Sequence, residues 1–416
     1  MKDGELPAGN LIMDFIKIVA IFVCLTLVTT TATTITFPKQ SQQEQTASEV
    51  FRPLEPGTPQ SLAYHVASLG LKALRDLLPS DGSVILSPFN IFSSLGILSL
   101  GADGETKTEI LNVLGPRNTN LDVIALADAS DGVSYAAAMF LDKLVEPNEE
   151  FKNSALRKFQ ASIINVDMNN GEEAKNSINS WVSYHTNGTI NNLLQEPLDP
   201  QTKMVVSSAL LFKGKWLKSF SPEATTRGKF YVDVNKTVDV QLMHLWATLP
   251  VVRSTHLDAL ALPYQGKDMT LYLILPKAPG FQGLKSLLSH LNVNSLRKLR
   301  STTVEQEVIV TIPKLKINGR YSLAKMLKQQ GISAMFNPET AKFGNLTKGG
   351  ERLHVSDIYQ SVHFETNEEG TTASAATASI LTKAKKPVFS ATKPFIILIT
   401  NENDLVLFMG AVVRPE

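Results

Sequence analysis

The chain contains few groups arranged to carry out a chemical reaction. Its seven histidines follow no spacing typical of metal ligands. The only cysteine, Cys24, lies in an apolar run near the N-terminus, so the rest of the chain has no thiol nucleophile. The motifs of serine hydrolases, zinc proteases, P-loop proteins and dinucleotide-binding proteins do not occur. The residues therefore predict neither an enzyme nor a metal or cofactor site.

The most informative segment is a run of small residues behind two acids and a glycine. Residues 371–379 contain only Thr, Ala and Ser, and the first large side chain is Ile380. As a strand, the run would present small uncharged side chains on both faces. It could therefore slide between two other strands without burying a charge, whereas the simpler interpretation is a Ser/Thr-rich surface loop. The two acids, the glycine and the part of the run expected to enter a sheet first are Glu368, Glu369, Gly370, Thr371, Thr372, Ala373, Ser374, Ala375, Ala376 and Thr377.

The elements around this run are of mixed type. Strand-like runs follow one another without regular intervening helices, which favours an α+β fold over a doubly wound sheet. Helical patterns are densest before residue 120 and at 172–184, 282–300 and 321–330. The strand-like runs are 204–213, 229–243, 258–276, 305–317, 355–366 and 394–413.

The composition predicts one large globular unit. Hydrophobic residues make up 43% and charged residues 19%, and no repeat or Pro/Gly/Ser linker divides residues 56–416. We therefore expect a single domain over that range. The net charge of +1 gives no reason to expect nucleic acid or an anionic membrane as a partner.

The N-terminus has the proportions of a signal peptide. An apolar run at 18–28 follows Lys17, is too short to span a bilayer, and precedes small residues with a cleavage site near Ala32. We expect residues 1–32 to be removed, residues 33–55 to be a disordered lead-in, and the mature chain to be secreted without disulfides. Translation from Met13 would give a more ordinary signal, and a signal anchor is the competing interpretation.

The ordered sequence blocks of the chain resemble those of the serpins, the serine-protease-inhibitor superfamily, over roughly residues 56–416. The resemblance implies three β-sheets with about nine helices, a five-stranded central sheet and an exposed reactive loop. The blocks are 84–91, 100–102 with Thr106, 178–182 with Thr186, 209–216 with Phe220, 262–264, 273–276, 312–315, 394–395 and 407–410.

This resemblance implies suicide inhibition of a serine protease by a monomeric protein. The protease attacks the loop and forms an acyl-enzyme, and the cut loop inserts into the central sheet by its hinge, the small-residue run described above. The alternative is a non-inhibitory carrier, chaperone or signalling protein with the same fold. Bulky, charged or proline-bearing hinges are common in that class, and residues 371–379 contain none.

Family spacing places the scissile bond between Ala384 and Lys385. Ala384 would suit an enzyme with a small primary pocket, such as an elastase. An offset of one residue gives Lys383 or Lys385, which trypsin-like enzymes recognise through a buried carboxylate, and Lys386 is disfavoured by Pro387 on its leaving side. Alternatively, the lysines only keep an exposed loop soluble.

The family's gate, beneath the point where the sheet opens, departs from its usual pattern here. Ser87 matches, but Asn90 replaces a serine, Ser208 an asparagine and Gln360 a histidine. All three substitutes can form hydrogen bonds, so we expect a rebuilt polar network. Trp216, near the point of loop entry, is retained.

Two further kinds of surface site are predicted. Asn187, Asn235 and Asn345 each begin a glycosylation sequon, although three matches are near random expectation. Arg297, Lys298 and Arg300 could bind a glycosaminoglycan, as the corresponding helix does in some relatives. Their alternative role is to complement the dipole at a helix end.

Overall fold

The computed structural model describes residues 55–79, 81–115, 118, 133–266, 269–349, 351–369 and 387–415. The predicted signal segment and all but the last residue of the predicted lead-in lie outside these ranges. So do hinge residues Gly370 to Thr377 and the lysine-bearing segment 383–386. Among the described helices, none is both long and apolar enough to span a membrane.

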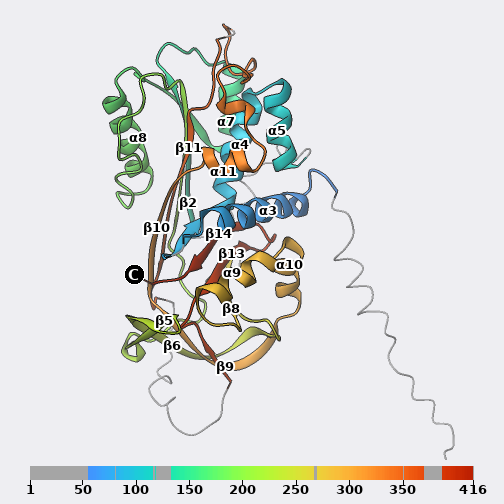
Figure 1. The fold of residues 1–416 in the computed structure, drawn as a ribbon, viewed down its shortest axis with the longest axis vertical. Coiled ribbons are helices and arrows are strands. Elements are labelled where there is room, and N and C mark those ends of the chain that lie inside the picture. The colour runs from blue at the N-terminus through green and yellow to red at the C-terminus, as the bar shows by residue number, and fades with distance from the viewer. Residues whose placement is uncertain are drawn as a thin grey trace, which may run out of the picture. The chain divides into compact units, whose positions relative to one another are not determined.

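A five-stranded sheet runs along the molecule in the order β10-β11-β4-β2-β3 (Figure 1). At its centre β4 and β11 are parallel neighbours, paired from Asp357↔Val205 to Phe364↔Phe212. The outer pairs β10–β11 and β2–β4 are antiparallel, and β2–β3 is parallel. The strands are β2 (Val133–Asp142), β3 (Ala161–Val166), β4 (Met204–Phe212), β10 (Leu315–Ser322) and β11 (Asp357–Thr366).

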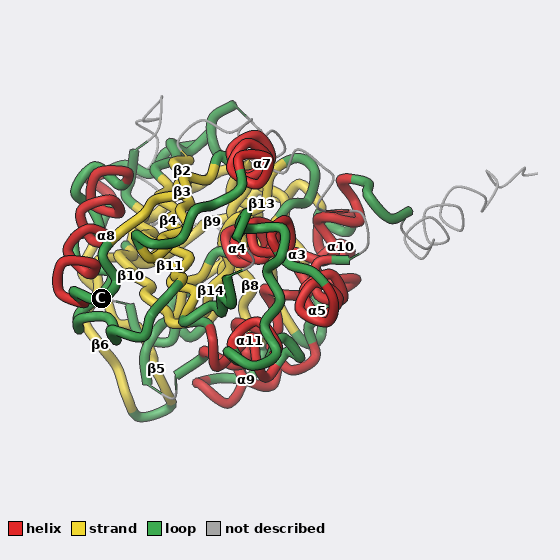
Figure 2. The backbone as a smooth tube through the Cα atoms, turned by 90° about the horizontal axis from the view of Figure 1, so that it is seen from above, coloured by secondary structure: helices red, strands yellow, loops and turns green. Residues whose placement is uncertain are grey.

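Both faces of this sheet are covered, which is why β4 is almost continuously apolar and buried at all nine positions. Helix α4 (Pro88–Gly101) lies on one face and α8 (Gly171–His185) on the other (Figure 2). Val206 and Leu210 of β4 belong to the main core, which also contains residues of α4. Val205 and Ala209 point the other way and pack with the buried side of α8.

A second sheet contains nine strands in the order β1-β14-β13-β8-β7-β6-β9-β12, with β5 also paired to β6. Strand β6 has 18 residues; its first part pairs with β5 and its last residues pair with β7. The expected three sheets therefore form two hydrogen-bonded sheets, because this one long strand joins two of them. The strands are β1 (Val84–Leu86), β5 (Thr226–Asp233), β6 (Lys236–Arg253), β7 (Leu257–Pro263), β8 (Met269–Pro276), β9 (Val304–Pro313), β12 (Val388–Ser390), β13 (Phe395–Asn401) and β14 (Val406–Val412).

Eight α-helices occur in the described residues, and most pack on one side of the two sheets. Helix α4 is buried along nearly its whole length, whereas α8 and α10 (Val293–Ser301) bury one face. The remaining α-helices are α3 (Pro59–Leu77), α5 (Gly104–Leu114), α7 (Glu149–Phe159), α9 (Gly280–His290) and α11 (Ala324–Gln329), and short 3₁₀ turns occur at η2 (Pro222–Ala224) and η3 (Ala334–Phe336).

Candidate functional site

The structure brings the predicted gate residues together beneath the seam between β4 and β11. Gln360 of β11 and Ser208 of β4 are register partners, and both side chains are fully buried. The Gln360 amide forms two hydrogen bonds with the backbone of Ser87: Nε2 donates to the carbonyl at 2.8 Å, and Oε1 accepts from the N–H at 3.0 Å. Ser208 accepts a hydrogen bond of 3.3 Å from Ser94. Each strand is therefore tied separately to α4.

Helix α4 begins at this network. Ser87 is its N-cap and accepts a hydrogen bond from the Asn90 N–H at 3.1 Å, with Pro88 in the first turn. The Ser87 hydroxyl also lies 3.3 Å from the side-chain oxygen of Asn90. The side-chain nitrogen of Asn90 is buried and has no partner among the described residues. Asn90 in place of the usual serine thus leaves one donor unsatisfied, at a cost of about 1–3 kcal/mol.

Trp216 holds the chain just before the hinge. Its indole N–H donates to the Asn367 carbonyl at 2.7 Å, and its backbone N–H donates to the Glu369 carbonyl at 3.1 Å. The indole is buried and stacks on Tyr264, with ring centroids 4.4 Å apart and planes 15° apart. Phe220 contacts the indole edge-on. A rigid aromatic group thus holds Asn367 and Glu369, the last described residues before the small-residue run.

Glu368 anchors the same residues to the neighbouring sheet. One carboxylate oxygen accepts from Lys314 Nζ at 2.7 Å and from the Thr225 hydroxyl at 2.6 Å. Burial by itself raises the pKa of Glu368, but the hydrogen bonds from Lys314 and Thr225 outweigh it, so the pKa lies below its ordinary value. Glu369, by contrast, is exposed. The two acids before the hinge therefore have different roles.

The far end of the loop is fixed by β12. This short strand pairs in parallel with β9, and the Ile309 N–H donates to the Pro387 carbonyl at 3.0 Å. The described chain thus stops at Glu369 on one side of the loop and resumes at Pro387 on the other. The hinge from Gly370 onward and the expected scissile residues Lys383, Ala384 and Lys385 lie between these anchors, outside the described residues.

The three cations predicted to bind a polyanion have different surroundings. Arg300 forms an ion pair with Asp404 at 2.5 Å and also donates to the Glu402 carbonyl at 2.9 Å. Arg297 is half-buried, and Lys298 is exposed. Arg300 is therefore already neutralised, whereas Arg297 and Lys298 form no ion pair with another described residue.

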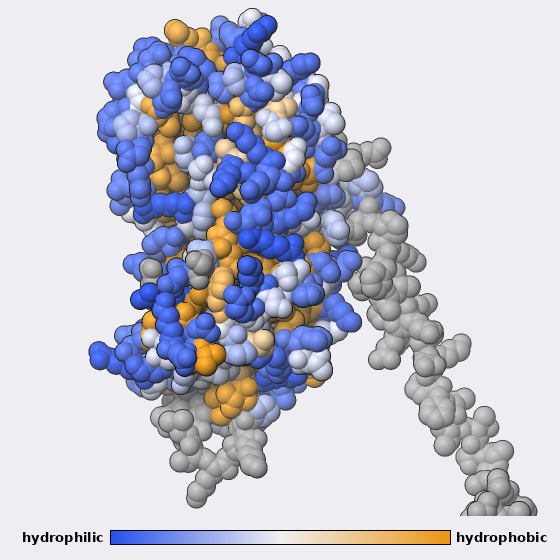
Figure 3. Space-filling model, viewed as in Figure 1, coloured by the Kyte–Doolittle hydropathy of each residue, from blue (hydrophilic) through white to orange (hydrophobic). Residues whose placement is uncertain are grey.

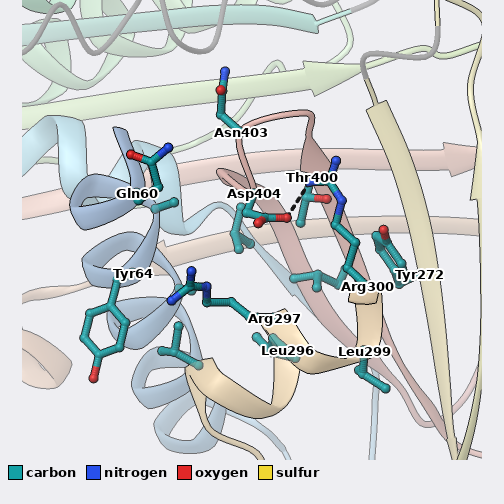
Figure 4. A pocket seen from close by; sticks show the side chains of 15 residues that line it. Gln60, Tyr64, Tyr272, Leu296, Arg297, Leu299, Arg300, Thr400, Asn403 and Asp404 are labelled. Atoms are coloured by element: carbon teal, nitrogen blue, oxygen red, sulfur yellow. Dashed lines mark hydrogen bonds and ion pairs between the residues drawn. The ribbon is translucent and has the colours of Figure 1, made fainter. Parts of the chain in front are cut away.

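Arg297 and Arg300 also line a cavity between α3, α10 and strands β8, β13 and β14 (Figure 4). Its remaining walls include Tyr64, Tyr272 and several leucines. The cavity volume is about 40 Å³, which is room for roughly three water molecules. No group of three or more His, Cys, Asp or Glu side chains that could hold a metal ion occurs among the described residues.

The predicted glycosylation sites differ in accessibility. Asn187 is exposed in a turn with a left-handed φ of 49°, and Asn235 is exposed between β5 and β6. The Asn345 side-chain amide donates to the Ala102 carbonyl at 3.2 Å, and the threonine of its sequon, Thr347, is only 4% exposed.

Sequence reasoning missed the partners of the named residues. Ser94, Asn367, Thr225 and Lys314 complete the gate and the anchor, but they lie far along the chain from the groups they contact. Lys314 belongs to one of the blocks that carry the family resemblance, yet no spacing rule links it to Glu368. Only the register between the sheets brings the two together.

The anchor at Glu368 should make stability depend on pH. Glu368→Gln is expected to lower the free energy of unfolding at neutral pH by about 1.5–3 kcal/mol, because hydrogen bonds to a charged group are lost. Since the folded-state pKa is below its ordinary value of 4.5, this contribution is complete above that pH and disappears as the pH falls through the lowered pKa. Urea unfolding of both proteins across this range tests the prediction. Glu369→Gln, at the exposed neighbour, should change little, and a difference that persists in acid would contradict the assignment.

The comparisons with known proteins agree with this geometry. The chain is 31% identical to human glia-derived nexin over 380 residues, which covers 86% of this chain and 94% of the relative. A crystal structure of native protease nexin-1 with heparin superposes with a TM-score of 0.78 at 28% identity, covering 86% of this chain and all of that one. Human thyroxine-binding globulin complexed with thyroxine gives a TM-score of 0.76 at 26% identity, with coverages of 86% and 99%.

The family model for serpins, described as serine protease inhibitors, matches residues 64–415. That match spans most of the chain, and the relatives are similar over nearly their whole length. The expected family and α+β fold are therefore confirmed, and the family is one of protease inhibitors rather than of enzymes. The chain belongs to the serpins.

Proposed function

We propose that this serpin is a suicide inhibitor of a trypsin-like serine protease. The observation that carries the proposal is the seam between β4 and β11. These strands are parallel, and the loop leaves from the end of β11 just beyond Thr366. A strand that turns back there and enters the seam runs antiparallel to both neighbours. It replaces one parallel pairing by two antiparallel ones, which are slightly more stable per residue.

The chemical step belongs to the protease. Its serine oxygen attacks the carbonyl carbon of the scissile residue, the C–N bond breaks, and the next residue leaves as an amine that takes up a proton. The first part of the loop stays joined to the protease as an ester. Release from Pro387 and β12 then frees the hinge to insert. Insertion must move the enzyme away before water hydrolyses the ester. Fast insertion requires that the native state is not the free-energy minimum and is kept from inserting its loop only by a kinetic barrier.

The hinge and the gate are suited to this movement. Residues 371–379 can enter the seam without burying a charge or a bulky group. Gln360 and Ser208 are bonded to the backbone at the start of α4 and to Ser94 of α4, respectively, and not to each other, so no direct hydrogen bond between these two side chains opposes separation of the strands. Trp216 and Glu368 hold the base of the loop at the end of the seam where β11 finishes. These arrangements support insertion between β4 and β11.

The remaining proposals concern processing of the chain, its secretion and a glycosaminoglycan partner. We propose that residues 1–32 are removed, that residues 33–55 form the lead-in to a single domain over 56–416, and that the mature protein is a secreted monomer without disulfides. For a glycosaminoglycan, the α10 cations without an ion pair to another described residue are Arg297 and Lys298. A solved relative was crystallised with heparin, which supports a glycosaminoglycan as a class of partner but does not locate its site.

A non-inhibitory carrier is the alternative. One solved relative was crystallised with thyroxine, and the cavity beside α3 and α10 is a mostly apolar feature to weigh for a small molecule. Its volume of about 40 Å³ is far below the roughly 300–1,000 Å³ of ligand pockets. The cavity therefore gives the carrier function little support in this conformation.

The target class depends on the lysines. Replacing Lys383, Lys385 and Lys386 together by serine should abolish the SDS-stable complex with a trypsin-like enzyme, since its specificity pocket would lose its cation. Gel electrophoresis and N-terminal sequencing of the released peptide report both the complex and the bond. If the variant still captures the enzyme as the wild type does, Ala384 is the recognised residue and an elastase-like target replaces the trypsin-like one.

The hinge should tolerate no charge. Thr371→Arg is expected to convert the inhibitor into a substrate, because burying an unpaired guanidinium costs on the order of several kcal/mol and slows insertion. Cleavage should continue, since the scissile bond is some forty ångströms of extended chain away at about 3.3 Å per residue. The measurement is the ratio of cleaved monomer to covalent complex. Thr371→Ser is the matched control, and an unchanged ratio in the arginine variant would rule out insertion of this hinge.

Glycans should occupy two of the three sequons. Asn187 and Asn235 are expected to be modified in secreted protein, whereas Asn345 should remain bare because its amide is hydrogen-bonded and Thr347 is buried. Mass spectrometry of peptides, with Asn→Gln variants at each site as references, measures occupancy. A glycan on Asn345 would mean that modification precedes folding of this segment.

A further inference from the structure

The far end of the reactive loop is held in a defined position on the nine-stranded sheet. Val388 begins β12, and its partner in the register is Ile309 of β9. Arg253, the last residue of β6, donates to the Val388 carbonyl at 2.8 Å and lies 5.8 Å from the centre of the Phe389 ring. Arg253 is itself held by Asp258 at 3.0 Å. The position of Val388 relative to β6 and β9 is therefore fixed.

This position lies close to the bond that a protease would attack. Counting back from Val388, Lys386 is two residues away and Lys383 five residues away. At about 3.3 Å per residue, the scissile bond is thus at most about 17 Å from Val388. A protease domain of about 230 residues has a radius of gyration of about 17 Å. A protease bound at this bond must therefore cover part of the surface around Val388.

Apolar side chains are exposed at the start of β9, five residues before Ile309, the register partner of Val388. Val304, the first residue of β9, is 68% exposed, and Val388 is 53% exposed. Between this end of β9, the end of β6 and helix α10 lies a groove with a volume of about 690 Å³. Its apolar lining includes Val251, Val252 and Leu299. Figure 3 shows hydrophobic atoms at the surface at this end of the nine-stranded sheet.

Among the described residues, no strand pairs with the first part of β9 on the side of β12. Strand β12 pairs only with Ile309 to Thr311, so β9 from Val304 to Val308 extends beyond it. Glu305 on this extension is exposed and forms no ion pair with another described residue. Lys298 of α10 lines the groove as well. The surface therefore offers an apolar groove with an unpaired carboxylate on its β9 side.

We propose that Val304, Glu305 and this groove form a second contact surface for the protease captured by the loop, an inference that rests on the proposed inhibitory function. The partner's chemistry follows from the surface. The protease places an apolar side chain against Val304 and the groove, and a cation opposite Glu305. This contact contributes to the selection of the target among enzymes that cleave after lysine, because the primary pocket alone does not distinguish them.

The inference can be tested with trypsin whose catalytic serine is replaced by alanine, which docks but cannot form the ester. In a Cys24→Ser background an introduced cysteine is the only thiol of the chain. Val304→Cys carries an environment-sensitive fluorophore, and Leu144→Cys is the matched control, since Leu144 is 76% exposed in the turn after β2. Addition of the inactive trypsin should raise and blue-shift the emission at position 304 and leave that at position 144 unchanged.

Charge reversal provides the second arm. Glu305→Lys should slow complex formation with active trypsin by about three- to tenfold at low salt, and the difference should shrink as salt rises, because contacts at an interface rim act mainly on the association rate. Glu339→Lys, which reverses another exposed acid, is the control and should have no effect. The ratio of complex to cleaved monomer should be the same in all variants, because the hinge is unaltered.

The possible outcomes distinguish failure of the second contact surface from failure of the proposed inhibitory function. If wild-type protein forms the covalent complex but position 304 gives no signal and Glu305→Lys reacts at the wild-type rate, the second surface is wrong and inhibition stands. A signal at position 304 that rises with the concentration of the serpin alone would make a second copy the occupant and would also overturn the inference. If wild-type protein neither binds inactive trypsin nor forms a complex with active trypsin, both proposals fail.

Discussion

The parallel pairing of β4 and β11 is the constraint on which the rest of this molecule depends. Two strands that pair in parallel cannot be joined by a short turn, so long stretches of chain must connect them. Such strands are typically buried on both faces of the sheet. Helices α4 and α8 provide that cover. The pairing also leaves one place where a strand entering from the end of β11 would be antiparallel to both neighbours. The proposed inhibitory mechanism depends on the insertion of a strand at this place.

The polar groups near the seam stabilise the closed sheet without tying its two central strands to each other. Gln360 and Ser208 are both bonded to α4, and the buried amide nitrogen of Asn90 lacks a partner among the described residues. An unsatisfied donor beneath the opening point stores a small amount of free energy in the closed state. A closed sheet that is stable but not optimal is what a metastable inhibitor requires.

The loop is held at both ends by contacts to the nine-stranded sheet. At one end Glu368 binds Lys314, which joins β9 to β10, and at the other β12 pairs with β9. Strand β9, or the residue directly after it, therefore takes part in both anchors. In the proposed mechanism this would link the rearrangement of the five-stranded sheet to the presentation of the loop. A surface on β9 is for that reason well placed to influence which enzyme is captured.

The sequence by itself determined the family, the α+β class and most of the helices and strands, because these depend on the order of blocks and on local periodicity. It did not predict β2, because alanines have little preference for strands and the burial of both faces of β2 is a tertiary feature. It also predicted a helix at 321–330, whereas β10 continues to Ser322 and α11 begins at Ala324. Only the tertiary structure decided that Glu368 binds Lys314, that Gln360 binds the backbone of Ser87, and that Arg300 is neutralised by Asp404. Each of these pairs joins residues far apart in the chain, and a periodic pattern reports the face of one element but not the register in which two elements meet.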